Sequence, residues 1–253
     1  MAKVIAFAQQ KGGVGKTTST INLAAALMER ERRVLLVDFD PQGALSAGLG
    51  LNPLALERTV YDVLRQASLP LAQVVQQTEG GFSLVPANID LAAAEIELVS
   101  EPGREYFLKE KLKAVQEEYD YVLIDCQPSL GLLALNALSA ADGAILPVQT
   151  EYFALRGMDL LFDTVRKVQA RINPALRVIG ILPTMYDART VHSREVLEEL
   201  RRVYPELLLK TIIPKTVKLP DSTIAGQSIL KFQPASSAAE AYRELAREVE
   251  ASE

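Results

Sequence analysis

A segment rich in glycine and lysine, residues 10–18, has the residue types and spacing of a loop that binds a phosphate chain. Its glycines let backbone N–H groups turn inward around phosphate oxygens, and a helix starting near Lys16 aims its positive dipole end at the same anion. We expect Lys16 to neutralise phosphate charge and the Thr17 hydroxyl to bind Mg²⁺. The expected nucleotide contacts come from Gly12, Gly13, Val14, Gly15, Lys16, Thr17 and Thr18. The general motif begins with glycine where this chain has Gln10.

Three aspartates follow apolar runs that are typical of strands. Asp38 and Asp40 end the run that starts at residue 34, and Asp125 ends the run that starts at residue 121. Alternation along a strand points Asp38 and Asp40 to the same side of the chain. A single aspartate at a strand end is more often a turn-former or a helix cap. Three of them near a phosphate loop favour a magnesium site, with direct or water-mediated binding.

The elements that must position these residues alternate along the chain. Short runs that are apolar throughout are typical of strands buried on both faces, and they occur at residues 4–8, 34–37, 82–85, 121–124, 144–148 and 178–182, with a weaker candidate at 207–213. Helix-like segments lie at residues 17–29, 104–118, 130–140, 157–170 and 193–204, the last with Ser193 as a possible cap. This order predicts an α/β fold: a doubly wound, mostly parallel sheet flanked by helices. No linker divides the chain, so we expect one domain over residues 1–253.

Composition excludes several classes of protein. The 253 residues are 49% hydrophobic and carry a net charge of −5, which is ordinary for a globular chain. No stretch approaches the roughly 20 apolar residues of a membrane span. The single cysteine, Cys126, excludes a disulfide framework and is expected to be a small buried hydrophobe, and the single histidine, His192, argues against histidine-based metal chemistry. The acidic balance argues provisionally against nonspecific nucleic-acid binding.

Residues 11–18, together with the segment from Asp38 to Gly43, resemble the ParA/MinD superfamily of ATPases with a deviant Walker A box, a P-loop NTPase fold. The resemblance implies that Lys11 reaches across a homodimer interface to the partner's ATP, much as an arginine finger does. It implies that Asp40 orients the attacking water, so that Lys11, Lys16 and Asp40 are the catalytic residues. Mg²⁺ is then bound by Thr17, Asp38 and Asp125. The chain departs from the family at Gln127, where proline is common.

Later segments resemble the chromosomal partition branch, the ParA/Soj type. These are residues 147–157, 184–190 and 213–219, and the resemblance places Met185 and Pro214 beside the adenine. Residues 220–223 depart from the usual pattern. Three other branches of the superfamily fit less well. A MinD-type protein is expected to end in a basic amphipathic helix, whereas this end is acidic. An iron–sulfur reductase needs two cysteines, and this chain has one; a large plasmid ParA needs an N-terminal DNA-reading domain, for which a phosphate loop at residue 10 leaves no room.

Basic residues gather locally in spite of the acidic total. Between residues 189 and 218 seven basic and four acidic residues give +3. Arg189 and Lys218 match family positions that contact DNA, and Lys215 lies between them in the same region. For Arg201 and Arg202 a solvated helix face is an equally good interpretation. His192 is expected to be a surface or capping residue.

Together these features predict a cytoplasmic, nucleoid-associated partition ATPase with no membrane attachment. ATP would drive a sandwich homodimer that binds double-stranded DNA without sequence specificity, and a ParB-type centromere-binding partner would stimulate slow, Mg²⁺-dependent hydrolysis. One alternative is a ParA-like ATPase that positions a protein cargo. Another is a metabolic P-loop enzyme, such as an amidoligase or a kinase.

Overall fold

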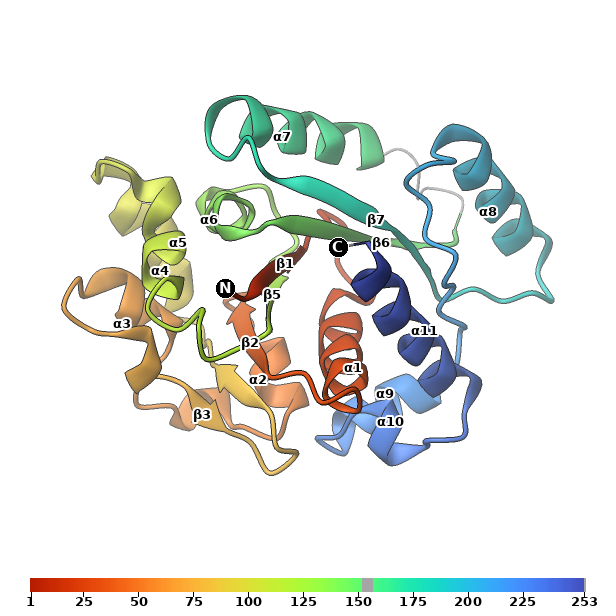
Figure 1. Ribbon diagram of the computed structural model, residues 1–253, viewed down its shortest axis with the longest axis horizontal. Coiled ribbons are helices and arrows are strands. Elements are labelled where there is room, and N and C mark those ends of the chain that lie inside the picture. Colours follow the sequence, from red (N-terminus) through yellow and green to blue (C-terminus); the bar gives the residue numbers. More distant parts are fainter. Residues whose placement is uncertain (152–156, 253) are drawn as a thin grey trace.

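The computed structural model, which describes residues 1–151 and 157–252, contains a seven-stranded sheet whose strands lie in the order β3-β4-β2-β5-β1-β6-β7 (Figure 1). Neighbouring strands pair in parallel except β3 and β4, which are antiparallel. The strands are β1 (Lys3–Phe7), β2 (Val34–Phe39), β3 (Gln76–Gln77), β4 (Ser83–Val85), β5 (Tyr121–Cys126), β6 (Gly143–Gln149) and β7 (Arg177–Thr184). The expected doubly wound α/β fold is confirmed.

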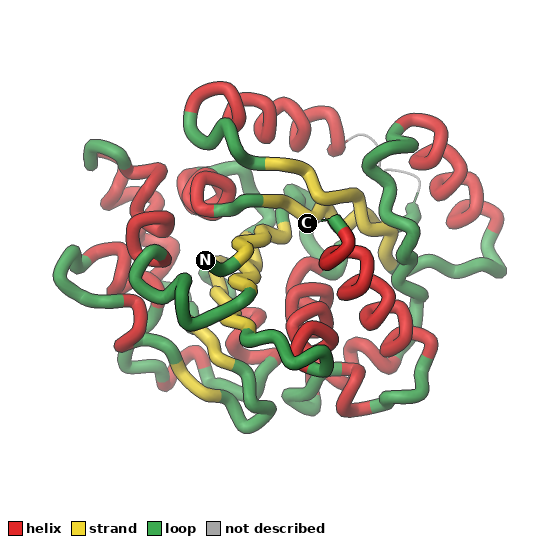
Figure 2. The backbone as a smooth tube through the Cα atoms, viewed as in Figure 1, coloured by secondary structure: helices red, strands yellow, loops and turns green. Residues whose placement is uncertain are grey.

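Helices cover both faces of the sheet, with strands as the middle layer (Figure 2). They are α1 (Lys16–Met28), α2 (Ala44–Gly48), α3 (Val60–Arg65), α4 (Leu91–Glu97), α5 (Phe107–Leu112), α6 (Leu132–Ala140), α7 (Met158–Arg171), α8 (Val191–Val203), α9 (Lys218–Ile224), α10 (Ile229–Phe232) and α11 (Ser237–Ala251). Short 3₁₀ turns lie at Pro53–Ala55, Leu71–Gln73, Leu98–Ser100 and Arg104–Tyr106. No described helix is both long and apolar enough to cross a membrane.

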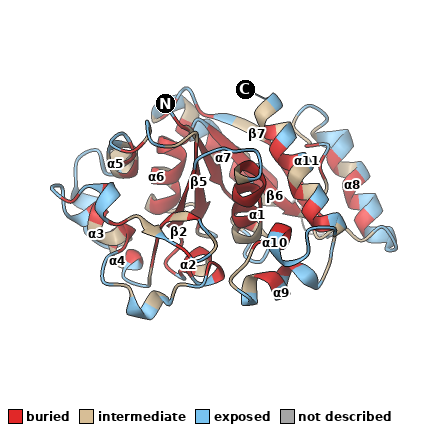
Figure 3. Ribbon diagram, turned by 60° about the horizontal axis from the view of Figure 1, so that its bottom comes forward, coloured by how far each residue is buried: buried red, intermediate tan, exposed pale blue. Residues whose placement is uncertain are grey.

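Alternate residues of each central strand enter two separate cores. In β5, Val122 and Ile124 pack with helices α3 to α8, whereas Tyr121 and Leu123 pack with α1, α2, α9, α10 and α11. The sheet-facing sides of both helix layers are buried (Figure 3). Since side chains alternate along a strand, Asp125 must face the same layer as Leu123, the layer that contains α1.

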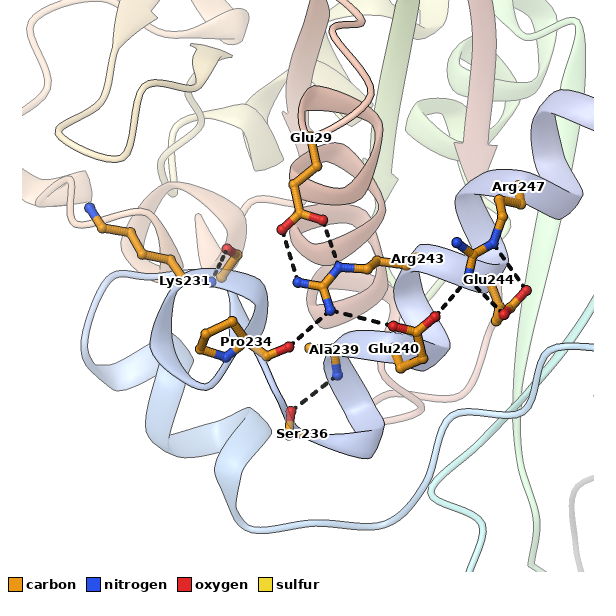
Figure 4. Close-up of polar contacts among 10 residues, drawn as sticks. Glu29, Lys231, Pro234, Ser236, Ala239, Glu240, Arg243, Glu244 and Arg247 are labelled. Carbon is orange, nitrogen blue, oxygen red and sulfur yellow. Dashed lines mark hydrogen bonds and ion pairs between the residues drawn. The ribbon is translucent and has the colours of Figure 1, made fainter.

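The C-terminal helix α11 braces α1, the helix that follows the phosphate loop. Tyr242 is buried with its hydroxyl 3.2 Å from the Ser19 hydroxyl, and Arg243 donates two hydrogen bonds to Glu29 (Figure 4). Glu250, in the last turn of α11, accepts from Arg30 and Arg32, which follow the C-terminal end of α1. Exposed ion pairs stabilise weakly, so the buried apolar face of α11 carries most of this contact.

The expected strand at residues 207–213 is wrong. This segment makes only an isolated bridge from Leu208 to Ile181, although Leu209 also donates to the Ile181 carbonyl. The Glu248 carboxylate on α11 accepts the N–H groups of Lys210 at 2.7 Å and Thr211 at 3.0 Å. A side chain thereby takes the donors that would continue a strand ladder.

Two helix predictions also need correction. Of the helix expected at residues 104–118, only Phe107–Leu112 is α-helical, and the following residues form separate i→i−3 turns ending at Glu118. The cap of α8 is Thr190, which accepts from the Ser193 N–H, rather than Ser193. The Ser193 hydroxyl instead donates to the Thr150 carbonyl at 3.2 Å. The other expected strands and helices agree with the structure to within a few residues. Residues 152–156 of the expected family segment lie outside the described residues.

Candidate functional site

Strand register brings two of the three candidate carboxylates side by side. Asp38 on β2 is the direct Cα partner of Asp125 on β5, and Phe7, the last residue of β1, is the partner of Asp125 on the other side. The phosphate loop leaves β1 at this edge of the sheet. Ligands in doubly wound folds bind beyond the carboxyl ends of the strands, where the chain changes direction across the sheet. The pairing therefore places the loop and the carboxylates at one such crevice.

The loop between β1 and α1 has the backbone of a phosphate cradle. Gly13 and Gly15 have φ values of 73° and 90°, a region that residues with a Cβ rarely adopt. Gly15 is the N-cap of α1, and no side chain that the structure describes caps this helix end, which leaves its first N–H groups directed at the crevice. The Thr184 hydroxyl at the end of β7 donates to the Val14 carbonyl at 2.8 Å and holds the loop in place.

Lys16 begins α1 and is largely buried, with 7% of its surface exposed. Its Nζ lies 3.4 Å from the Lys11 carbonyl across the loop. Burial lowers the pKa of the Lys16 ammonium, and the carboxyl groups of Asp125 and Asp40 oppose this shift. The lysine thus points toward the carboxylates, in the space that a phosphate chain held by the loop would share.

Asp125 is the most unusual group of the site. It is 1% exposed, and neither carboxyl oxygen has a hydrogen-bond partner among the described residues. Burial, and then the charge of Asp38, raises the pKa of Asp125 to about 8, while Thr17 and Lys16 act in the opposite direction. Buried polar groups are normally paired, so an orphaned carboxyl beside a hydroxyl fits a missing cation.

The oxygen atoms available here fit Mg²⁺ bound jointly by protein, phosphate and water better than a cation bound by protein side chains alone. Among residues 1–151 and 157–252 no group of three His, Cys, Asp or Glu side chains could hold a metal ion. Mg²⁺ is commonly held by one or two protein oxygens together with phosphate oxygens and water. Thr17 and Asp125 supply such oxygens at the edge of the phosphate loop.

Asp38 and Asp40 have different surroundings. Asp38 is fully buried, and its Oδ2 accepts from the Ser46 N–H at 2.8 Å and the Ser46 hydroxyl at 2.7 Å, while Oδ1 accepts from the Asp40 N–H. Burial raises the pKa of Asp38 to about 6 despite these bonds. Asp40 is 9% exposed and accepts from the Gln42 N–H at 2.9 Å. Asp38 therefore orders the turn that presents Asp40.

Lys11 lies on the outer rim of the loop, and its side chain is 45% exposed. Its Nζ contacts Gln149, the last residue of β6, at 3.1 Å and Glu151, two residues further on, at 3.6 Å. A cavity of about 260 Å³ lies between these segments, lined by Gln9, Gln10, Lys11, Val14, Val148, Gln149 and Gly157. Lys11 is thus a partly exposed residue whose ammonium group contacts its own chain at the end of β6.

Two loops that the sequence associates with adenine and DNA are joined by backbone hydrogen bonds. Tyr186 donates to the Ile213 carbonyl at 3.0 Å and accepts from the Lys215 N–H at 2.8 Å, so Tyr186 and Pro214 form a bridge. Met185, directly after β7, has a φ of 53°, which is uncommon for a residue with a side chain. Met185 thus lies between Thr184, which bonds to the phosphate loop, and Tyr186, which pairs with Pro214.

The basic residues of these loops are exposed, and some of them are paired with acidic residues of their own chain. Arg189 is 87% exposed in its side chain and donates twice to Asp187, whose pKa falls to about 2 through this contact, with Lys215 adding to the effect. Lys218, at the start of α9, lies 3.9 Å from Asp221. Asp187 lies just outside the segment counted from the sequence, and including it lowers the local charge from +3 to +2.

Other basic residues of this region belong to a self-paired helix face. Arg201 and Arg202 on α8 contact Glu198 and Glu199, three residues earlier in each case. His192 is exposed in the first turn of the same helix, near Glu195. Cys126 is buried as expected, and burial raises the pKa of its thiol. Ser46 and Thr184, which position the site, carried no recognisable sequence signal, because their partners lie eight and 170 residues away.

Comparison with known proteins places this geometry in a family. The sequence model of an AAA domain matches residues 2–178. The sporulation initiation inhibitor Soj of Bacillus subtilis is 46% identical over 99% of both chains, and the chromosome partitioning protein ParA of Myxococcus xanthus is 42% identical over 98% of this chain and 88% of its own. This chain belongs to the ParA/Soj family of P-loop ATPases. An uncharacterized protein of Mycobacterium tuberculosis is 54% identical over 98% of this chain and 78% of its own.

One similar solved structure is described by a different activity. A Mycobacterium smegmatis protein described as cobyrinic acid a,c-diamide synthase is 44% identical, covers 98% of this chain and 93% of its own, and superposes with a TM-score of 0.87. It was crystallised with ADP and magnesium and with an ATP analogue and magnesium. That protein therefore binds the two ligands that the loop and the orphaned Asp125 of the present ParA/Soj chain would accommodate.

Proposed function

We propose that this chain is a single-domain, DNA-partition ATPase that slowly hydrolyses Mg²⁺-ATP as a sandwich homodimer. The backbone of residues 12–18 would hold the phosphates, with Lys16 against the β- and γ-phosphates and Met185 and Pro214 beside the adenine. Thr17 and Asp125 would hold Mg²⁺, and Asp38 would support that site through the Asp40 turn. When bound, Mg²⁺ neutralises phosphate charge that builds up during transfer.

Asp40 and Lys11 would have separate roles in the hydrolysis step. Asp40, presented by the turn that Asp38 and Ser46 hold, would accept a hydrogen bond from the attacking water and orient it. Lys11 would leave Gln149 and Glu151 and reach the ATP of the partner subunit, which adds positive charge where the transferring phosphoryl group becomes negative. Because Lys11 would act on the ATP of the partner subunit, hydrolysis would depend on dimerisation.

The observation that supports DNA as the partner is the joined pair of loops. Arg189, Lys215 and Lys218 project from segments that the Tyr186 hydrogen bonds bind into one surface. A few cations on one subunit bind DNA weakly, and linking two such surfaces in a dimer raises avidity by about 10²–10⁴. ATP would therefore favour retention on nucleoid DNA in the cytoplasm. A ParB-type partner that stimulates hydrolysis would release the dimer.

The test compares DNA retention by Arg189→Ala/Lys218→Ala with retention by Arg201→Ala/Arg202→Ala. Both variants remove two positive charges per subunit, and all four residues are paired with acidic residues of their own chain. The two variants differ in place, because Arg201 and Arg202 lie on α8 and not on the joined loops or at the start of α9. The wild-type ATP-bound dimer should bind unrelated DNA duplexes equally. The first variant should dimerise with ATP and lose DNA binding, and the slope of log K against log salt should fall by about 3 to 4 for the four lost contacts. The Arg201→Ala/Arg202→Ala control should keep most of the DNA binding and most of the salt dependence of the wild type.

Two results would contradict the proposal. Equal DNA retention by both variants at matched salt would exclude the joined loops as the DNA surface. A wild-type dimer that hydrolyses ATP but shows no DNA binding would favour the positioning of a protein cargo instead. ATP turnover with and without DNA, and then with a ParB-type protein, separates these cases in one series.

A second candidate rests on the 44% identical protein described as cobyrinic acid a,c-diamide synthase. Amide synthesis needs room for a large acceptor and a source of ammonia. The cavity of about 260 Å³ beside Lys11 is smaller than ordinary ligand pockets, which begin near 300 Å³. Cys126, the only thiol, is buried and cannot serve as an accessible nucleophile that releases ammonia from glutamine. Cobyrinic acid with glutamine or ammonia should therefore not increase ATP turnover, and amide formation would refute this argument.

A further inference from the structure

The loop that leaves β5 is tied to α4 by one side-chain contact. This loop, residues 127–131, starts two positions after Asp125 and ends at α6. Gln127 donates from Nε2 to Glu95 Oε1 at 2.9 Å. The same oxygen lies 3.5 Å from the N–H of Leu133 in the first turn of α6. Glu95 therefore contacts both ends of the loop from a separate helix.

The Glu95 carboxylate takes the place of a local helix cap. The N-cap of α6 is Gly131, which has no side chain to accept the first N–H groups of the helix. A carboxylate at a helix N-terminus is favoured by those donors and by the helix dipole. A Cβ built on Gly131 would lie 2.2 Å from Glu95 Oε1, so the carboxylate occupies space that only glycine leaves open.

The middle of the loop is short and internally bonded. Ser129 donates from its backbone to the Gln127 carbonyl at 2.9 Å, and its hydroxyl accepts from the Gly131 N–H at 3.2 Å. With both ends held by Glu95, the path of the chain from Cys126 into α6 has little freedom. The loop leaves the sheet directly after Asp125 and Cys126, at the end of β5 where the Asp125 carboxyl lies.

We infer that Glu95 is a positioning residue for ATP hydrolysis, because its bond to Gln127 and its contact with the Leu133 N–H hold the loop that follows Asp125 at the carboxyl end of β5. This inference rests on the proposed role of Asp125 at Mg²⁺. The phosphates are held by residues 12–18, a different segment, so loss of Glu95 leaves the main binding contacts intact. Glu95 therefore acts on the rate of turnover more than on the affinity for ATP.

The test measures ATP affinity, kcat and thermal midpoint for Glu95→Ala, with Glu97→Ala as the control. Glu97 is on the same helix with the same charge, but it accepts from the Tyr61 hydroxyl, away from the loop. We expect kcat to fall about tenfold in Glu95→Ala, the scale of one lost bond to a charged group, with ATP Kd within about twofold of wild type. Glu97→Ala should leave both unchanged. Glu95→Gln keeps an acceptor oxygen and should recover most of kcat.

Gln127→Ala and the double variant Glu95→Ala/Gln127→Ala are measured in the same way. If Glu95→Ala does not fold, Gln127→Ala tests the same contact in its place. Both single changes break the contact between Glu95 and Gln127, and Glu95→Ala also removes the contact with the Leu133 N–H. The double variant should therefore be no slower than Glu95→Ala. Multiplicative losses of kcat, equal kcat in Glu95→Ala and Glu97→Ala, or a rise in ATP Kd that matches the fall in kcat would overturn the inference. A wild-type chain that does not hydrolyse ATP would instead refute the proposed function.

Discussion

Replacement of Asp125 by asparagine should change the pH dependence of folding stability in a predictable direction. In the folded chain burial raises the pKa of Asp125 from 3.8 to about 8, whereas in the unfolded chain the carboxyl ionises near its usual value. Between these values the folded chain keeps a proton that the unfolded chain has lost. The free energy of unfolding of the wild type therefore falls as pH rises through this window, by up to about 1.4 kcal/mol per unit.

Asparagine does not titrate, so Asp125→Asn escapes this loss. The difference in free energy of unfolding between Asp125→Asn and wild type should grow by about 3 to 4 kcal/mol from pH 5 to pH 8 in favour of the variant, with the curve flattening near the folded pKa. The amide leaves its own polar atoms in the same buried place, which lowers the absolute stability equally at every pH. The slope with pH is therefore the informative quantity.

Urea unfolding of nucleotide-free and metal-free protein at pH 5, 6, 7 and 8 measures this slope. Asp120→Asn is the control, because Arg33 lowers the pKa of Asp120 to about 2 and the carboxyl is ionised in both states over this range. Its difference from wild type should stay constant. Parallel curves for wild type and Asp125→Asn would refute a buried, protonated Asp125. With Mg²⁺ and ATP, wild type should gain more stability at pH 8 than at pH 6, because a bound cation favours the ionised carboxylate.

Substitutions at two further positions, Asp40 and Thr184, test the roles of single side chains. Asp40→Ala should lower ATP turnover by about 10²-fold or more and accumulate ATP-bound dimer on DNA, and so should Asp40→Asn, which keeps an acceptor for the Gln42 N–H. Turnover assays with size-exclusion chromatography measure both effects. Normal turnover would show that Asp40 has no role in catalysis. Thr184→Val leaves the Val14 carbonyl without its 2.8 Å donor, so the free energy of unfolding should fall by about 1–3 kcal/mol and ATP Kd should rise. Chemical unfolding and equilibrium ATP binding check this, and unchanged ATP binding would show that Thr184 does not hold the phosphate loop.

The sheet was predictable because its central strands are buried on both faces. Continuous apolar runs mark β1, β2, β5, β6 and β7, and each candidate carboxylate stands where such a run ends. Which aspartate would be orphaned was not predictable. Asp38 and Asp125 occupy equivalent strand ends, and only the tertiary position of Ser46 satisfies one and leaves the other without a partner.

Errors arose where a distant side chain replaced a local backbone partner. Residues 207–213 have the composition of a strand, but Glu248, 37 and 38 residues further along the chain, takes the N–H groups of Thr211 and Lys210. Gln127 was visible as a departure from the family, yet its partner Glu95 became evident only when α4 and the loop were placed together. In each case a carboxylate accepts backbone or amide donors that the local pattern assigns elsewhere.

The phosphate loop and the proposed DNA surface meet at the end of β7. Thr184 holds the Val14 carbonyl of the loop, and the next residue, Met185, has a left-handed backbone that costs energy unless its surroundings impose it. Tyr186 then bonds to both sides of Pro214, and Arg189 follows three residues later on the same turn. A shift of the loop on nucleotide binding would thus reach the basic residues through one strained, hydrogen-bonded turn. Because residues 187–218 carry a net charge of only +2 and Asp187 pairs with Arg189, small displacements of Arg189 from Asp187 would change its availability to phosphate substantially.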